Sequence, residues 1–112
     1  MTIRQREIGD VVVLDIDGKI MGGVDSELFQ ETIQSLIDSG KRKVVVNLEN
    51  VKWINSTGLG VLIAGYSALQ KSGGRLKLLQ VSERVEGLLN ITKLSTIFES
   101  YQGEDEAVES FV

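Results

Sequence analysis

Three residues whose side chains can cap a helix stand together where a helix is expected to begin: Asn55, Ser56 and Thr57. Their side-chain oxygens are of the types that accept hydrogen bonds from the free backbone N–H groups of a helix N-terminus. Gly58 and Gly60 follow at once, although a glycine inside a helix costs about 1 kcal/mol relative to alanine. Two interpretations are open. Ser56 is a regulated hydroxyl left accessible by small neighbours, or it is an N-cap and the glycines are packing contacts.

The hydroxyl of Ser56 lacks the neighbours that would make it a catalytic nucleophile. The chain contains no histidine and no cysteine, and no lysine stands beside Ser56 in the sequence to act as its base. A phosphate-binding loop of the Walker type requires a lysine that the segment 58–61 does not contain. We therefore expect a protein that is not an enzyme and that uses no cofactor.

Asp15 and Asp17 raise the question of a metal site. They alternate with Ile16 on an expected strand and so share one face of it. This arrangement occurs in metal pairs and in aspartyl-phosphate receivers, but the further acid, hydroxyl and lysine of a receiver have no clear candidates here. We interpret the two aspartates as charges at the edge or end of a strand and expect no metal site.

Length and composition indicate one globular domain over residues 1–112. The chain has 42% hydrophobic and 25% charged residues, which is ordinary for a soluble domain. No apolar run is long enough to span a membrane, and the N-terminus lacks a signal-peptide core, so we expect a cytoplasmic protein without direct membrane contact. The net charge of −4 opposes nucleic-acid binding. The basic run 41–43 is expected to complement the C-terminal end of a helix dipole.

The hydrophobic pattern predicts alternating strands and helices, which is typical of an α/β sheet covered by helices. We expect an antiparallel hairpin of strands 3–8 and 11–17 and further strands at 43–48, 75–81 and near 97–101. Helices are expected at 24–39, at 55–72, from the N-cap candidate Ser82 onward, and at 104–112. Gly65 inside the second helix predicts that a ring or another backbone segment lies against it.

The segment 18–23 is expected to be a glycine-framed loop that carries two apolar side chains, Ile20 and Met21. Two interpretations are equally open for them. They pack under the loop into the core, or they contact a partner, for which a flexible methionine is well suited.

The motif Asn55-Ser56-Thr57-Gly58-Leu59-Gly60-Val61, preceded by Val-Asn-Leu-Glu-Asn-Val and followed by Lys71-Ser72-Gly73-Gly74, resembles the core of the STAS family. Within that family the likeness is to the bacterial anti-sigma factor antagonists, and it covers essentially the whole chain. The resemblance implies a mixed sheet of four or five strands with helices mainly on one face. It also implies an acceptor serine at the start of the second helix.

By this resemblance Ser56 is the phospho-acceptor. The implied partner is an anti-sigma factor with serine kinase activity, which itself binds the ATP, and a metal-dependent phosphatase restores the serine. The unmodified protein would capture the anti-sigma factor and so free a sigma factor. Partner contacts are expected from the residues around the acceptor turn: Ile20, Met21, Asn55, Thr57, Gly58 and Leu59.

Two segments depart from the family pattern. Asn55 stands where the family usually has aspartate, and Gly18-Lys19-Ile20-Met21 stands where it often has Gly-Glu-Leu/Ile-Asp. Both departures bear on which partner is bound. The alternative hypothesis is a non-switching STAS subunit of a lipid or anion transport assembly or of a signalling scaffold. The sequence leaves the oligomeric state open, a homodimer included.

Overall fold

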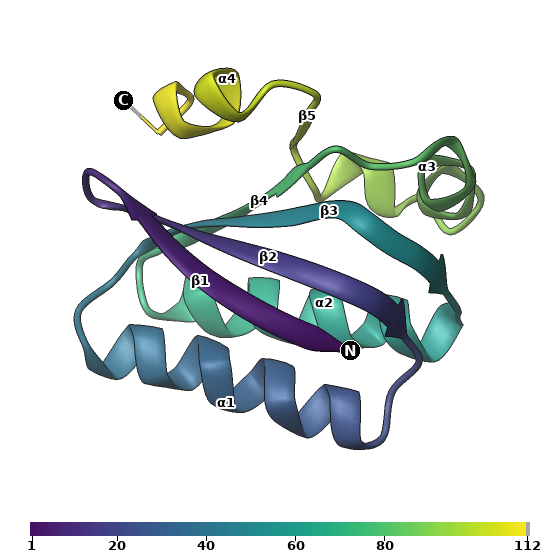
Figure 1. Ribbon diagram of the computed structural model, residues 1–112, viewed down its shortest axis with the longest axis horizontal. Helices are drawn as coiled ribbons and strands as arrows, with labels where there is room; N and C mark the ends of the chain where they lie inside the picture. The colour runs from purple at the N-terminus through teal and green to yellow at the C-terminus, as the bar shows by residue number, and fades with distance from the viewer. Residues whose placement is uncertain (112) are drawn as a thin grey trace.

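A computed structural model describes residues 1–111 of the chain (Figure 1). The elements follow in the order β1 (Thr2–Ile8), β2 (Val11–Ile20), α1 (Val24–Asp38), β3 (Lys43–Ile54), α2 (Ser56–Lys71), β4 (Arg75–Leu79), α3 (Glu83–Ile91), a 3₁₀ turn (Leu94–Thr96), β5 (Ser100–Tyr101) and α4 (Glu104–Glu109). The expected alternation of strands and helices is confirmed. Val112, the last residue of the expected terminal helix, lies outside the described residues.

The five strands form one mixed sheet in the order β1-β2-β3-β4-β5. β1 and β2 are an antiparallel hairpin, as expected, whereas β2, β3, β4 and β5 pair in parallel. The carboxyl ends of β2 and β3 therefore lie at the same end of the sheet. Because α1 and α2 start directly after these two strands, both helix N-termini are brought to that end (Figure 1).

Alternate residues of the strands face two separate apolar clusters. Val12, Leu14 and Val46 belong to the main core, to which α1, α2 and α3 contribute. On the opposite face a smaller cluster forms around Val13 and Ala107, where α4 packs on the sheet (Figure 1). The expected arrangement, with helices mainly on one face of a mixed sheet, is confirmed.

β2 and β3 are longer than the sequence predicts, and this corrects the expected loop 18–23. The parallel ladder continues through Gly18 opposite Val51 and Ile20 opposite Ile54, with two bulges on the way. Ile20 is 0% exposed. Because the burial of Ile20 in the main core stabilises the continuation of β2 past Gly18, the free loop is shorter than expected.

Side chains at the helix ends and crossings confirm three local expectations. Arg42 Nη1 donates a hydrogen bond of 3.0 Å to the carbonyl of Ile37, near the C-terminal end of α1. Gly65 lies against the ring of Phe29, which leaves no room for a Cβ atom. Ser82 caps α3 by accepting a hydrogen bond from the Val85 N–H. Among residues 1–111, no helix is both long and apolar enough to cross a membrane.

Candidate functional site

The turn that carries Ser56, the expected phospho-acceptor, lies where β3 ends and α2 begins. Asn55 is the N-cap of α2, because its Oδ1 accepts a hydrogen bond of 2.7 Å from the Gly58 N–H. Ser56 is the first residue of the helix and is exposed. No hydrogen bond of the Ser56 hydroxyl is present within residues 1–111. The N-cap role that one interpretation gave to Ser56 therefore belongs to Asn55. The hydroxyl of Ser56 remains accessible, as the other interpretation expected.

The two glycines after the hydroxyls have different surroundings. Gly58 is buried, and a Cβ atom there would collide with the carbonyl oxygen of Ile20 at the end of β2. Gly60 is exposed, and a Cβ atom there would have no atom of another residue within 4 Å. Gly58 is thus a packing contact that holds α2 against β2, while Gly60 leaves the surface beside Ser56 open.

The connection between β2 and α1 forms one side of the turn. Met21 is 41% exposed, and its N–H donates a hydrogen bond of 3.3 Å to Asp25 Oδ2 at the start of α1. Gly22 lies directly against the methyl group of Thr57, so a side chain at position 22 would meet it. Val24 is 79% exposed, which adds a second apolar side chain to this surface.

Three expected partner contacts, Ile20, Gly58 and Leu59, are corrected by burial. Ile20 and Leu59 are 0% and 2% exposed, and both belong to the main core. Leu59 lies three positions after Ser56, on the face of α2 that covers the sheet. Neither side chain is presented to a partner, and Gly58 is buried as well, whereas Met21, Asn55 and Thr57 lie at the surface.

An apolar groove, absent from the expectations, forms the other side of the turn. It has a volume of about 470 Å³ and lies between the β3–α2 junction and α3, with the lining residues Trp53, Ile54, Asn55, Ser56, Glu83, Arg84, Gly87, Leu88 and Ile91. Ile91 is 81% exposed. The guanidinium carbon of Arg84 lies 4.2 Å from the centre of the Trp53 ring. Arg84, Leu88 and Ile91 are spaced i, i+4, i+7, so they share one face of α3, and this spacing is the signal in the sequence that indicates the groove.

Asp15 is not the strand-edge charge that we expected. It is 6% exposed and lies opposite Arg4 in the β1–β2 ladder. Arg6 Nε donates a hydrogen bond of 2.6 Å to its Oδ2, and Asn47 Nδ2 donates one of 2.8 Å to its Oδ1. The bond from Arg6, opposed by burial and helped by Asn47, holds the pKa of Asp15 below its usual value.

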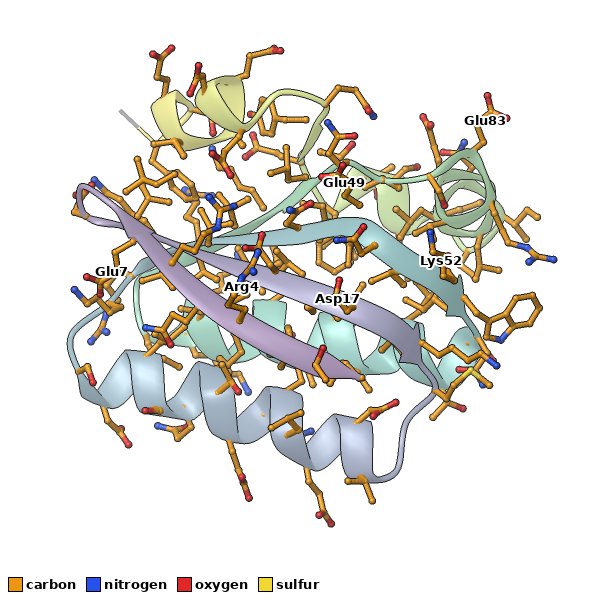
Figure 2. All side chains as sticks on the ribbon, viewed as in Figure 1. Arg4, Glu7, Asp17, Glu49, Lys52 and Glu83 are labelled. Carbon is orange, nitrogen blue, oxygen red and sulfur yellow. The ribbon has the colours of Figure 1, made fainter. Side chains whose placement is uncertain are left out.

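This ion-pair cluster belongs to the opposite face of the sheet from α1 and α2. Arg6 also donates a hydrogen bond to Glu104 of α4, and its hydrogen bonds to the carboxylates of Asp15 and Glu104 raise its pKa. Figure 2 shows the labelled Arg4, Asp17 and Glu49 along this open side of the sheet. Residues 1–111 hold no group of three or more side chains that would form a metal site. The cluster is therefore a structural tie between β1, β2, β3 and α4, away from Ser56.

Comparisons with known proteins agree with this geometry. The STAS domain family model matches residues 2–107. The anti-sigma-B factor antagonist of Staphylococcus aureus is 34% identical over 76 residues, which are 68% of this chain and 70% of that protein. A crystal structure of a candidate anti-sigma factor antagonist from Thermotoga maritima is similar with a TM-score of 0.87 and 28% identity, covering 96% of this chain and 92% of that one.

The Bacillus cell fate determinant SpoIIAA has the same fold in two states. Its phosphorylated form matches with a TM-score of 0.75 at 19% identity, covering 99% of this chain and 100% of that one. The anti-sigma factor antagonist SpoIIAA in its unphosphorylated form matches with a TM-score of 0.74 at 19% identity, covering 98% and 97%. With the family model and the relatives taken together, this chain belongs to the STAS domain family, among the proteins of the anti-sigma factor antagonist type.

Proposed function

We propose that this protein is a phosphorylation-controlled antagonist of an anti-sigma factor and that Ser56 is its phospho-acceptor. The unmodified form binds a cytoplasmic anti-sigma factor with serine kinase activity and thereby releases a sigma factor. The observation that carries the proposal is the exposed Ser56 hydroxyl, which is left without a capping role because Asn55 fills it. ATP is bound by the partner. Its γ-phosphoryl group passes to Ser56 Oγ, whose proton goes to the partner's base, and ADP leaves.

The position of Ser56 allows a phosphate without a change of fold. A phosphate adds a charge of about −1.5 to −2 at pH 7, and the N-terminus of a helix favours anions. The first turn of α2 contains no acidic side chain that would repel it. The phosphorylated and unphosphorylated forms of SpoIIAA share the fold of this chain, which supports the same tolerance here.

A docked partner would tolerate the phosphate less well than the helix does. An anion buried in an interface loses its hydration, and like charges placed together across an interface cost several kcal/mol. Each 1.4 kcal/mol of this cost lowers the affinity about tenfold, so a cost of several kcal/mol displaces a transient partner. A metal-dependent phosphatase then returns the chain to its binding form.

The surface that surrounds Ser56 has the composition of a partner-binding site. Met21 and Val24 lie on the α1 side, and Trp53 and Ile91 lie on the groove side. Exposed apolar residues gathered around a polar centre are typical of protein interfaces. We propose that the anti-sigma factor contacts this surface together with Asn55 and Thr57.

The proposal is tested by capture from lysate of the source organism with the wild type, Ser56→Ala and Ser56→Asp as baits. Ser35→Asp is the charge-matched control, because Ser35 is exposed on the later half of α1, away from the end where Ser56 lies. We expect a protein with an ATP-binding kinase fold to be retained by wild type, Ser56→Ala and Ser35→Asp and lost with Ser56→Asp.

Mass spectrometry of the native protein completes the test. We expect phosphate on Ser56, distinguished from Thr57 by peptide fragmentation. Equal capture by Ser56→Asp and wild type would contradict the proposal. Transport or scaffold subunits retained by every bait would instead support the non-switching alternative.

A further inference from the structure

Arg84 is the one cation among the described residues that line the groove beside Ser56. It is exposed in the first turn of α3, and its guanidinium group covers the ring of Trp53 at 4.2 Å. No ion pair between Arg84 and a carboxylate is present within residues 1–111. The strongest donor at this groove therefore rests on an aromatic face and not on an anion.

Resting on the proposed function, we propose that Arg84 is the receptor within this chain for the phosphate on Ser56. On phosphorylation its guanidinium leaves Trp53 and donates hydrogen bonds to the phosphate oxygens. The planar fork of arginine matches a phosphate with two parallel hydrogen bonds. Such charge-assisted bonds are stronger than a cation–π contact at an exposed site, so the phosphate competes successfully for Arg84.

The charges around the groove favour this exchange. Glu83 is the one carboxylate among the described residues that line the groove, and it precedes Arg84 on α3, so it is the one lining side chain whose charge opposes the phosphate. The backbone N–H groups at the start of α2 attract the phosphate to the same place. Phosphorylation would thus draw the Arg84 side chain across the groove from α3 to α2, covering apolar surface that the partner uses.

The exchange gives the switch two parts that a simple charge does not have. The phosphate repels like charges of the partner or loses its hydration in the interface. At the same time, the Arg84 side chain occupies the groove. Trp53, which lies three residues before Ser56, loses its covering guanidinium. An aspartate at position 56 offers one carboxylate at a shorter reach than a phosphoserine, so it would engage Arg84 less completely.

The test uses the full chain with phosphoserine placed at position 56 during synthesis and follows the second pKa of the phosphate by ³¹P NMR. An opposite charge favours the dianion and lowers this pKa. We expect Arg84→Gln to raise it by about 0.2 to 0.7 unit, the effect of one exposed ion pair. Arg84→Lys, which keeps the charge but not the fork, is expected to give an intermediate value.

Arg75→Gln is the matched control. Arg75 is also exposed, but it begins β4 at the amino end of the parallel strands, opposite the end where Ser56 follows β3. We expect its phosphate pKa to equal that of the wild type. The proposal would be overturned if the phosphate pKa were the same in Arg84→Gln and wild type, or if it rose equally in Arg84→Gln and Arg75→Gln.

Fluorescence gives a second readout, because Trp53 is the only tryptophan of the chain. We expect the emission of the wild type to differ between its serine and phosphoserine forms, and that of Arg84→Gln to differ much less. Identical emission of both wild-type forms would mean that Arg84 stays on the indole, against the proposal. No kinase takes part in either measurement, so failure here leaves the capture experiment standing, and failure of capture leaves this result intact.

Discussion

Asn55 Oδ1 and the Gly58 N–H are joined by a hydrogen bond of 2.7 Å, and this bond assigns the cap of α2 to Asn55, the residue before Ser56. We expect Asn55→Ala to lower the free energy of unfolding by about 1 kcal/mol, the usual loss when a cap is removed. Ser56→Ala, which removes no hydrogen bond within residues 1–111, should leave it unchanged within about 0.5 kcal/mol. Urea denaturation of the two variants measures the difference. Equal losses would mean that Ser56 shares the capping role.

The contrast between Gly58 and Gly60 gives a second prediction. Gly58→Ala would drive a methyl group into the carbonyl of Ile20, and we expect a loss of about 2 kcal/mol or more because backbone atoms on both sides must shift. Gly60→Ala places its methyl group in open space and should stabilise α2 by up to about 1 kcal/mol. Thermal melting of both variants decides the matter. A stable Gly58→Ala protein would refute the tight contact between α2 and β2.

The sequence was sufficient to predict the elements whose pattern is local. The hairpin β1–β2, the amphipathic helix α1 and the cap of α3 by Ser82 follow from periodicity and from residue types at helix starts, and each is present. The turn between β3 and α2 was placed correctly for the same reason. Its cap was assigned between neighbouring candidates only by the structure, since Asn55 and Ser56 have similar capping preferences.

Features that depend on contacts distant in sequence were not predictable. The burial of Asp15 requires the pairing of β1 with β2 and the side chain of Asn47 on β3, and no single stretch of sequence shows these together. The continuation of β2 to Ile20 depends on a parallel partner, β3, that is itself longer than its apolar run. The groove beside Ser56 exists because α3 returns to the β3–α2 junction, a tertiary arrangement that the helical face Arg84, Leu88, Ile91 indicates only in retrospect.

The Asp15 cluster predicts a pH dependence of stability. The pKa of Asp15 is lowered in the folded state, first by the hydrogen bond from Arg6, so the unfolded chain binds more protons and stability rises with pH. The contribution is complete above the unfolded pKa of about 3.9 and is lost as pH falls through the folded value. We expect Asp15→Asn to unfold with a shallower dependence on pH below about 4.5 than the wild type.

At pH 7 the same variant should be less stable by about 1 to 3 kcal/mol, toward the low end because Arg6 is 37% exposed and solvent screens it. Asp17→Asn is the control, since Asp17 is exposed on the same strand and face. Chemical denaturation at several pH values compares the variants. Parallel pH profiles for Asp15→Asn and wild type would rule out the cluster as a source of acid sensitivity.

Two exposed isoleucines allow the proposed binding surface to be tested without changing the charge of Ser56. Ile91 is 81% exposed and lines the groove beside Ser56, whereas Ile97 is 40% exposed and lies near Tyr66 and Gln70, which belong to the later half of α2. A central apolar contact of an interface typically contributes about 1 to 2 kcal/mol or more. We therefore expect Ile91→Ser to weaken binding of the captured anti-sigma factor about tenfold and Ile97→Ser to leave it unchanged. Titration calorimetry measures both affinities, and thermal melting checks that both variants stay folded. If Ile97→Ser weakened binding as much as Ile91→Ser, the partner would cover a surface other than the groove beside Ser56.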